Sequence, residues 1–189
     1  MKRHVMIDIE TMGKGPRAAI LAIGAVEFDP VGTSRNPSFY RVVSLASSVA
    51  AGLETDAETV IWWMGQPDAA RAAASAGGRN DSLESALRSL SAFLIGDALS
   101  DEKEDLIVWA NGASFDFPIL SEAFRLCGIE KPWHYWNERC HRTLRKTIPG
   151  VVEPERGGEK HNALDDAAHQ AASLQAILAT LGREPALAA

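Results

Sequence analysis

The sequence lacks the features that mark small secreted proteins and membrane proteins. It has only two cysteines, Cys127 and Cys140, which are too few for a dense disulfide framework. No apolar run approaches the roughly 18 residues that a membrane span needs, and the first residues show no signal-peptide pattern. These absences favour a cytoplasmic protein without a membrane partner.

Basic residues are also scarce relative to acidic ones. The 189 residues include 19 Lys and Arg against 25 Asp and Glu, which gives a formal net charge of −6. Because phosphate binding usually requires a basic surface, the overall charge by itself argues against a nucleic-acid partner. The length and an ordinary hydrophobic share of 46% predict one folded domain over residues 1–189, with a short flexible tail from about residue 183.

The spacing of apolar residues predicts a mixed sheet covered by helices. Strands are expected at 5–10, 19–28, 39–43 and 106–109, the first three joined by short turns. Helical segments are expected at 59–64, 67–76, 82–94, 117–126, 139–146 and 163–181. This order predicts an α/β fold of the mixed type, in which an antiparallel meander comes first, a parallel strand follows, and helices flank the sheet.

Two acids end the first expected strand, where a buried strand should be apolar. Asp8 and Glu10 are two residues apart, so both carboxylates point to the same face. Like charges at this distance raise each other's pKa unless a cation separates them, and oxygen ligands suit Mg²⁺ or Mn²⁺. Asp-x-Glu is a common pattern, however, and taken alone it fits a solvated edge-strand face better.

Two later segments add acids in comparable positions. Asp116 stands where the fourth expected strand gives way to a helix, and it either serves a site or caps that helix. His161 and Asp166 lie at the start of the last helix, whose spacing directs Asp166 rather than Asp165 toward a cleft. Acids in a first helical turn also complement the helix dipole. Taken together, the three segments favour one shared cleft over a separate structural role for the acids of each segment.

These motifs resemble the DnaQ-like, DEDDh-type 3′–5′ exonucleases of the ribonuclease-H-like superfamily, over residues 5–28, 109–120 and 161–172. The similarity is closer to the branch of mycobacterial exoribonuclease-like and phage exonuclease-A-like proteins. The phrases that carry it are Asp8-Ile9-Glu10-Thr11-Met12-Gly13, Thr59-Val60-Ile61-Trp62-Trp63, Ser114-Phe115-Asp116-Phe117-Pro118-Ile119-Leu120 and Tyr135-Trp136-Asn137. One departure is Arg139-Cys140-His141-Arg142-Thr143, where the branch has Arg-Asp-x-Arg-Thr. It puts in doubt how the Arg142 segment is held, and hence substrate preference.

The resemblance implies a metal-dependent hydrolase that acts on the 3′ end of single-stranded DNA or RNA and releases nucleoside 5′-monophosphates. The expected metal ligands for two divalent cations, Mg²⁺ or Mn²⁺, are Asp8, Glu10, Asp116 and Asp166. His161 is the expected base that takes a proton from the attacking water. The expected substrate contacts are Thr11, Met12, Asn111, Phe115 and Arg142.

Other aromatic residues and histidines are given structural roles. The tryptophans expected in the core or at a subunit contact are Trp62, Trp63, Trp133 and Trp136. The histidines expected to be structural or on the surface are His4, His134, His141 and His169.

Several alternatives stay open at this stage. A small-molecule phosphohydrolase would share the paired acids but would not need the His-x-x-x-x-Asp helix. A catalytically weak nucleic-acid-binding or scaffold module of the same fold is the non-enzymatic alternative. DNA and RNA are not distinguished, because recognition of a 2′-OH depends on local geometry. A homodimer is compatible with the branch. Two bound divalent cations would offset four of the six net negative charges, so the overall charge does not exclude nucleic acid.

Overall fold

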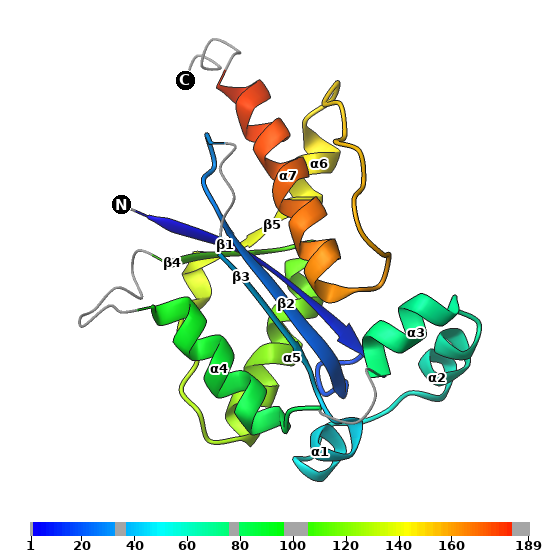
Figure 1. Cartoon of the computed structure of the whole chain (residues 1–189). Helices are drawn as coiled ribbons and strands as arrows, with labels where there is room; N and C mark the ends of the chain where they lie inside the picture. The colour runs from blue at the N-terminus through cyan, green and yellow to red at the C-terminus, as the bar shows by residue number, and fades with distance from the viewer. Residues whose placement is uncertain (1, 33–36, 76–79, 97–105, 183–189) are drawn as a thin grey trace.

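A five-stranded mixed sheet runs through the protein in the order β3-β2-β1-β4-β5. The computed structural model describes residues 2–32, 37–75, 80–96 and 106–182, so the tail expected from residue 183 lies outside the described residues (Figure 1). The strands are β1 (Arg3–Thr11), β2 (Ile20–Phe28), β3 (Ser38–Val42), β4 (Leu106–Ala110) and β5 (Glu138–Cys140). β1, β2 and β3 form an antiparallel meander, and β4 and β5 continue the sheet in parallel from β1. The predicted fold class is confirmed.

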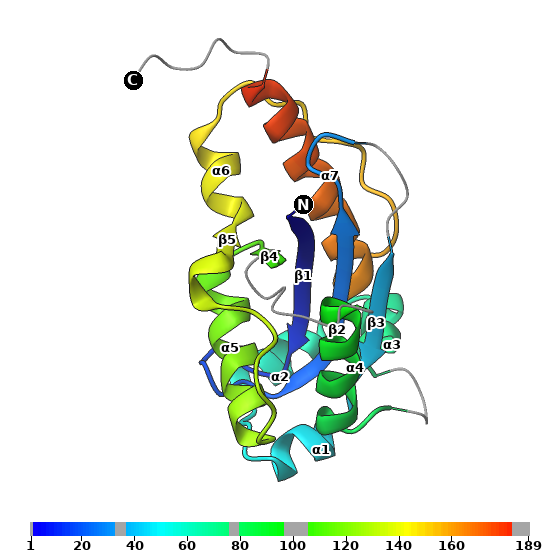
Figure 2. The ribbon, with the colours of Figure 1, turned by 90° about the vertical axis from the view of Figure 1, so that its left-hand side faces the viewer.

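Helices cover both faces of this sheet. They are α1 (Leu45–Ala50), α2 (Ala57–Met64), α3 (Asp68–Ser75), α4 (Leu83–Ile95), α5 (Ala113–Leu126), α6 (His141–Thr147) and α7 (Ala163–Leu181), with a 3₁₀ turn η2 (Tyr135–Asn137). One hydrophobic cluster joins α4 and α5 to one face, and a second joins α7 to the other. Figure 1 shows α7 running alongside β2, and Figure 2 shows it on the side of the sheet away from α5. Among the described helices, none is both long and apolar enough to cross a membrane.

The alternation of side chains along β1 decides which way its acids point. Ile7 and Ile9 belong to the hydrophobic cluster under α4 and α5, whereas Met6 belongs to the cluster under α7. Successive side chains in a strand point to opposite faces, so Asp8 and Glu10 follow Met6 onto the α7 face. At this end of the strand the apolar packing gives way to carboxylates.

A glycine in β2 lets the start of α7 approach the sheet closely. Gly24 is the cross-strand partner of Asp8. A Cβ atom built on Gly24 would lie 2.2 Å from the backbone of Ala163, the first residue of α7. No residue with a side chain fits in this space, which is the close backbone approach that a glycine in a strand often marks. The first turn of α7, including Asp166, is thereby seated beside the end of β1.

Three short elements, α1, η2 and β5, were not predicted from the sequence. The residues of α1 lack a clear apolar period, and β5 overlaps the start of the segment expected to be helical from residue 139. β5 exists because three of its residues pair in parallel with β4 at the edge of the sheet. Such a pairing is a tertiary contact, and local periodicity does not contain it.

The start of α5 also differs from the prediction. The helix begins at Ala113 rather than at residue 117, and its N-cap is Gly112, with a φ of 120°. This left-handed conformation, which glycine adopts readily, lets the chain turn directly from β4 into the helix. Asp116 therefore lies within the first turn and does not cap the helix, so the capping interpretation is wrong.

Candidate active site

The end of β1 and the first turns of α5 and α7 meet around a pocket of about 320 Å³, here called the carboxylate pocket. All the predicted metal ligands and the predicted base line it: Asp8, Glu10, Asp116, Asp166 and His161. Three of the predicted substrate contacts line it as well: Asn111, Phe115 and Arg142. Segments that are far apart in the sequence thus contribute to one cavity.

Three of the carboxylates are held in conditions that disfavour their charged form. Burial, together with the neighbouring Asp116 and Glu10 carboxylates, raises the pKa of Asp8 well above its usual range. Burial and Asp116 raise the pKa of Glu10 to about 7. Burial also raises the pKa of Asp116 to about 7, against the lowering effect of backbone hydrogen bonds and Arg142. The raised pKa values mean that ionisation of these carboxylates is unfavourable, and a bound divalent cation would stabilise their ionised forms.

The donor atoms of the pocket suit such a cation. Glu10, His161 and Asp166 each offer a ligand atom, and these atoms all lie within 4.8 Å of one another. Asp8 is held by a hydrogen bond of 2.8 Å that its Oδ1 accepts from Gln170 Nε2. Carboxylate oxygens are the ligands that Mg²⁺ and Mn²⁺ prefer. The residues present therefore fit divalent cations.

His161 has an unusual backbone and a perturbed side chain. Its φ is 63°, in the left-handed region that few residues other than glycine adopt. Its backbone N–H donates a hydrogen bond of 3.1 Å to Asp166 Oδ2. Burial and the nearby charges of Arg156 and Lys160 lower the pKa of the imidazole. The lowered pKa favours the neutral ring, which is the form that accepts a proton.

Two tryptophans of α2 pack against the His161 ring. The ring centroid of Trp62 lies 5.0 Å from that of His161 and the centroid of Trp63 lies 6.3 Å away, both edge-on. Trp63 is buried, and its Nε1 donates a hydrogen bond of 2.9 Å to the Thr11 carbonyl, as expected for a core residue. Trp62 is 44% exposed and does not lie in the core. Of the two positions expected for Trp62, the core is therefore wrong, whereas a subunit contact stays a prediction.

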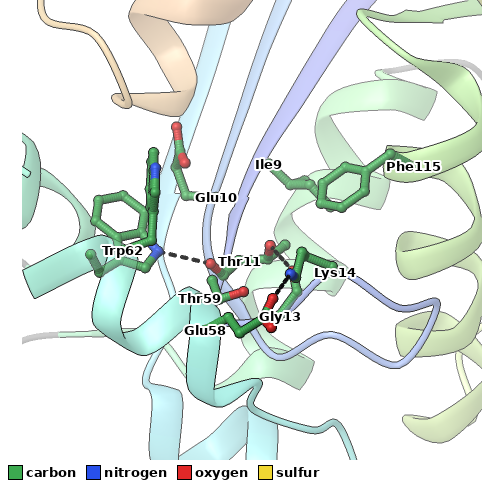
Figure 3. A pocket seen from close by; sticks show the side chains of 10 residues that line it. Ile9, Glu10, Thr11, Gly13, Lys14, Glu58, Thr59, Trp62 and Phe115 are labelled. Carbon is green, nitrogen blue, oxygen red and sulfur yellow. Dashed lines mark hydrogen bonds and ion pairs between the residues drawn. The ribbon is translucent and has the colours of Figure 1, made fainter. Parts of the chain in front are cut away.

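A second pocket of about 460 Å³, here called the aromatic pocket, adjoins the first and shares Ile9, Glu10 and Phe115 with it. Figure 3 shows Trp62 and Phe115 on opposite sides of this pocket, with Glu10 at one end. The ion pair between Lys14 and Glu58 lies at the other end. The volume is in the range of small-molecule sites.

The two predicted substrate contacts that follow Glu10 have different positions. Thr11 lines the aromatic pocket, and its Oγ1 donates a hydrogen bond of 2.7 Å to the Gly13 carbonyl. Met12 lines neither pocket and instead packs against the core beside Trp63. The structure therefore does not bring Met12 to the other site residues, because the backbone turns after Thr11.

Arg142 is fixed beside the first turn of α5. Its Nη2 donates a hydrogen bond of 2.7 Å to the Asn111 carbonyl. Its guanidinium packs on Gly112, where a Cβ atom would lie 3.1 Å from it. Cys140, at the position where the branch has Asp, is the N-cap residue of α6. The segment around Arg142 is thus held by backbone and packing contacts without that acid.

Further residues of the carboxylate pocket were missed by the sequence analysis. Arg156 forms an ion pair with Asp166, and Gln170 orients Asp8. Gln170 follows Asp166 by one helical turn, so its spacing carried a signal. Arg156 lies in an irregular segment, where no periodicity marks a functional residue. His141 and His169, expected to be structural or on the surface, also line the pocket.

Known proteins that are similar to this chain are nucleases. A family model described as the 3′-5′ exoribonuclease Rv2179c-like domain matches residues 3–178. An exodeoxyribonuclease of Enterobacteria phage T4 is 27% identical over 162 residues, which cover 73% of this chain and 68% of the relative.

Solved structures show the same fold. Apo exonuclease I has a TM-score of 0.66 at 14% identity, covering 98% of this chain and 43% of that one. The E. coli exonuclease I complex with a dT13 oligonucleotide has a TM-score of 0.62 at 13% identity, covering 97% and 41%. The nuclease domain of 3′hExo, a DEDDh family member bound to rAMP, has a TM-score of 0.62 at 12% identity, covering 95% and 92%. This chain thus spans about two fifths of the exonuclease I chains it matches.

Proposed function

The chain belongs to the 3′-5′ exoribonuclease Rv2179c-like domain family, and we propose that it hydrolyses the last phosphodiester at the 3′ end of single-stranded RNA or DNA. The released product is a nucleoside 5′-monophosphate. One observation carries this proposal: the carboxylate pocket and the aromatic pocket adjoin each other and share Glu10 and Phe115. A terminal nucleoside in the aromatic pocket has its 5′-phosphate next to the carboxylates.

The four acids of the carboxylate pocket would hold two divalent cations, Mg²⁺ or Mn²⁺. When bound, such cations stabilise charge on the attacking and leaving oxygens of a phosphodiester. Asp8 and Glu10 are fixed by β1, and Asp116 and Asp166 by the first turns of two helices. The ligands therefore come from rigid elements, which keeps them in place through repeated turnover.

His161 is the proposed general base. Its neutral ring accepts the proton of the attacking water at a ring nitrogen, which a pKa below the ordinary value of histidine permits at neutral pH. The contact with Trp62 limits the orientations of the ring. A His161→Ala variant is expected to lose most of its activity, and rates near those of the wild type would remove His161 from this role.

The aromatic pocket is the proposed site of the 3′-terminal nucleoside. Trp62 and Phe115 offer faces on which any base stacks, with little dependence on sequence. The exposed Lys14–Glu58 ion pair lies at the far end of this pocket. Arg142, at the rim of the carboxylate pocket, is the proposed contact to the phosphate backbone.

The test uses 5′-labelled single-stranded RNA, single-stranded DNA and duplexes, digested with Mg²⁺ or Mn²⁺. A ladder that shortens from the 3′ end is the expected result. Asp8→Asn is expected to abolish it, whereas Asp68→Asn, on the exposed surface of α3, is the matched control and should not. Comparing RNA with DNA of the same sequence decides the sugar preference. If no substrate is cut although Mn²⁺ binds, the domain is a nucleic-acid-binding module.

A further inference from the structure

The guanidinium of Arg156 lies inside the carboxylate pocket. It forms an ion pair with Asp166, a proposed metal ligand, through one of its terminal nitrogens. The Arg156 side chain is only 26% exposed, although it comes from the irregular segment between α6 and α7. Its positive charge partly offsets the rise in the pKa of Asp8 and contributes to the lowered pKa of His161. Arg156 thus contacts a carboxylate that is also a proposed ligand of a divalent cation.

The segment that carries Arg156 is attached to α7 on both sides of this residue. On one side, Glu153 Oε2 accepts a hydrogen bond of 2.7 Å from Ser173 Oγ, and Glu153 Oε1 lies 3.5 Å from Arg145 Nη1. On the other side, Glu159 N–H donates a hydrogen bond of 2.9 Å to Asp165 Oδ2. The backbone around Arg156 is therefore tethered, and its long side chain is directed at the acids.

The guanidinium is not held by a complete set of partners. Its Nε and Nη2 are both buried, and within the part of the chain that the structure describes neither makes a hydrogen bond, so Nη2 meets Asp166 only as an ion pair. A bidentate pair with a carboxylate would use the guanidinium more fully and bind it more firmly. The contact with Asp166 neutralises charge in the pocket without locking the arginine in it.

A divalent cation and Arg156 need the same carboxylate. We propose that Arg156 is the resident cation of the carboxylate pocket in the metal-free protein, and that divalent cations bind by displacing it from Asp166. The proposal rests on the proposed function, since it takes Asp166 as a metal ligand. Its consequence is that the apparent metal affinity is lower than the carboxylates alone would allow, because metal binds only to the fraction of molecules in which Arg156 has left.

Mn²⁺ titration of the metal-free protein, followed by calorimetry, tests this without any substrate. Arg156→Gln is expected to tighten Mn²⁺ binding by about tenfold, as it would if Arg156 covered Asp166 in nine of ten molecules. Arg145→Gln is the matched control: it removes the same charge from the lining of the same pocket, but from a residue paired with Glu153. It should change the affinity less than twofold. Arg156→Lys, which keeps a charge, should bind Mn²⁺ nearly as the wild type does.

An unchanged or weakened Mn²⁺ affinity in Arg156→Gln would overturn the proposal, and so would equal tightening in Arg145→Gln. If neither the wild type nor Arg156→Gln binds Mn²⁺, both this proposal and the metal-dependent function fail. If the wild type degrades nucleic acid with Mn²⁺ while Arg156→Gln binds the ion no more tightly, only the displacement by metal is wrong. Binding in the variants also shows that they are folded.

Discussion

The indole of Trp62 lies edge-on to the imidazole of His161, with 5.0 Å between their ring centroids. Trp62 also forms one wall of the aromatic pocket. A single side chain therefore contacts both the proposed base and the proposed site of the terminal nucleoside. Because His161 has a left-handed backbone at the end of an irregular segment, neighbouring side chains rather than a helix or strand limit how its ring turns.

Trp62→Ala is expected to lower kcat by about tenfold, because misplacing a catalytic group is costly even when the group itself is intact. Loss of the indole also exposes His161 and raises its pKa toward the ordinary value. The acidic limb of the profile of kcat/KM against pH should therefore move to higher pH, since the base must be deprotonated to act. Steady-state kinetics across pH 5 to 9 measures both effects.

Trp136→Ala is the control for this change, because Trp136 is 49% exposed on η2 and lines neither pocket. It should leave kcat and the pH profile unchanged. Trp62→Phe should recover part of the lost rate. An unshifted acidic limb in Trp62→Ala would show that Trp62 only binds substrate.

Asp116→Asn tests how ionisation of the Asp116 carboxylate affects the free energy of unfolding when no metal is bound. The pKa of Asp116 in the folded protein is about 7, above its value in an unfolded chain, so stability falls as the pH rises toward and through 7. In EDTA, Asp116→Asn should therefore gain stability relative to the wild type between pH 5 and pH 8, by about 2 kcal/mol.

Urea unfolding at the two pH values measures this difference. His141, whose pKa burial lowers to about 4, makes stability rise with pH over the acidic range, but it does so in both proteins and cancels. Saturating Mn²⁺ should reverse the order, because the ion stabilises the wild type. An identical stability difference at pH 5 and pH 8 would contradict the assignment of the shift to Asp116.

Gly24→Ala should displace the start of α7 from the sheet, because the added Cβ atom would meet the Ala163 backbone at 2.2 Å. We expect Tm to fall by about 5 °C or more. Mn²⁺ affinity should fall with it, since Asp166 would move away from Asp8. Gly15→Ala is the control, because a Cβ atom there meets no atom within 4 Å. The expected fall in Tm with an unchanged Mn²⁺ affinity would mean that the pocket does not depend on this contact.

Arg142→Ala should raise the KM for single strands by several fold with a smaller effect on kcat. If Arg142 contacts one phosphate, the slope of log affinity against log salt should become shallower by about 0.7. Arg125→Ala, at the exposed end of α5 and paired with Glu122, should change neither value. Fluorescence anisotropy of labelled oligonucleotides in EDTA measures the slope, and an unchanged slope would exclude a phosphate contact.

Regular elements made much of the site predictable from sequence. The strand period placed Asp8 and Glu10 on one face, and the helical period favoured Asp166 over Asp165. These three residues line the carboxylate pocket. The role of Trp62 and the position of Arg156 were not predictable in this way. Both depend on where an irregular segment and a short helix are packed, which no local period encodes. Met12 was misplaced for the same reason, since a backbone turn decides its direction.

The carboxylate pocket joins the first strand of the chain to its last helix. Asp8 and Glu10 leave the ribosome early, whereas Asp166 follows more than 150 residues later. Because translation adds only about 5–20 residues per second, several seconds pass between the synthesis of the first two proposed ligands and that of the last. The proposed metal site is therefore complete only after the last helix has docked on the sheet.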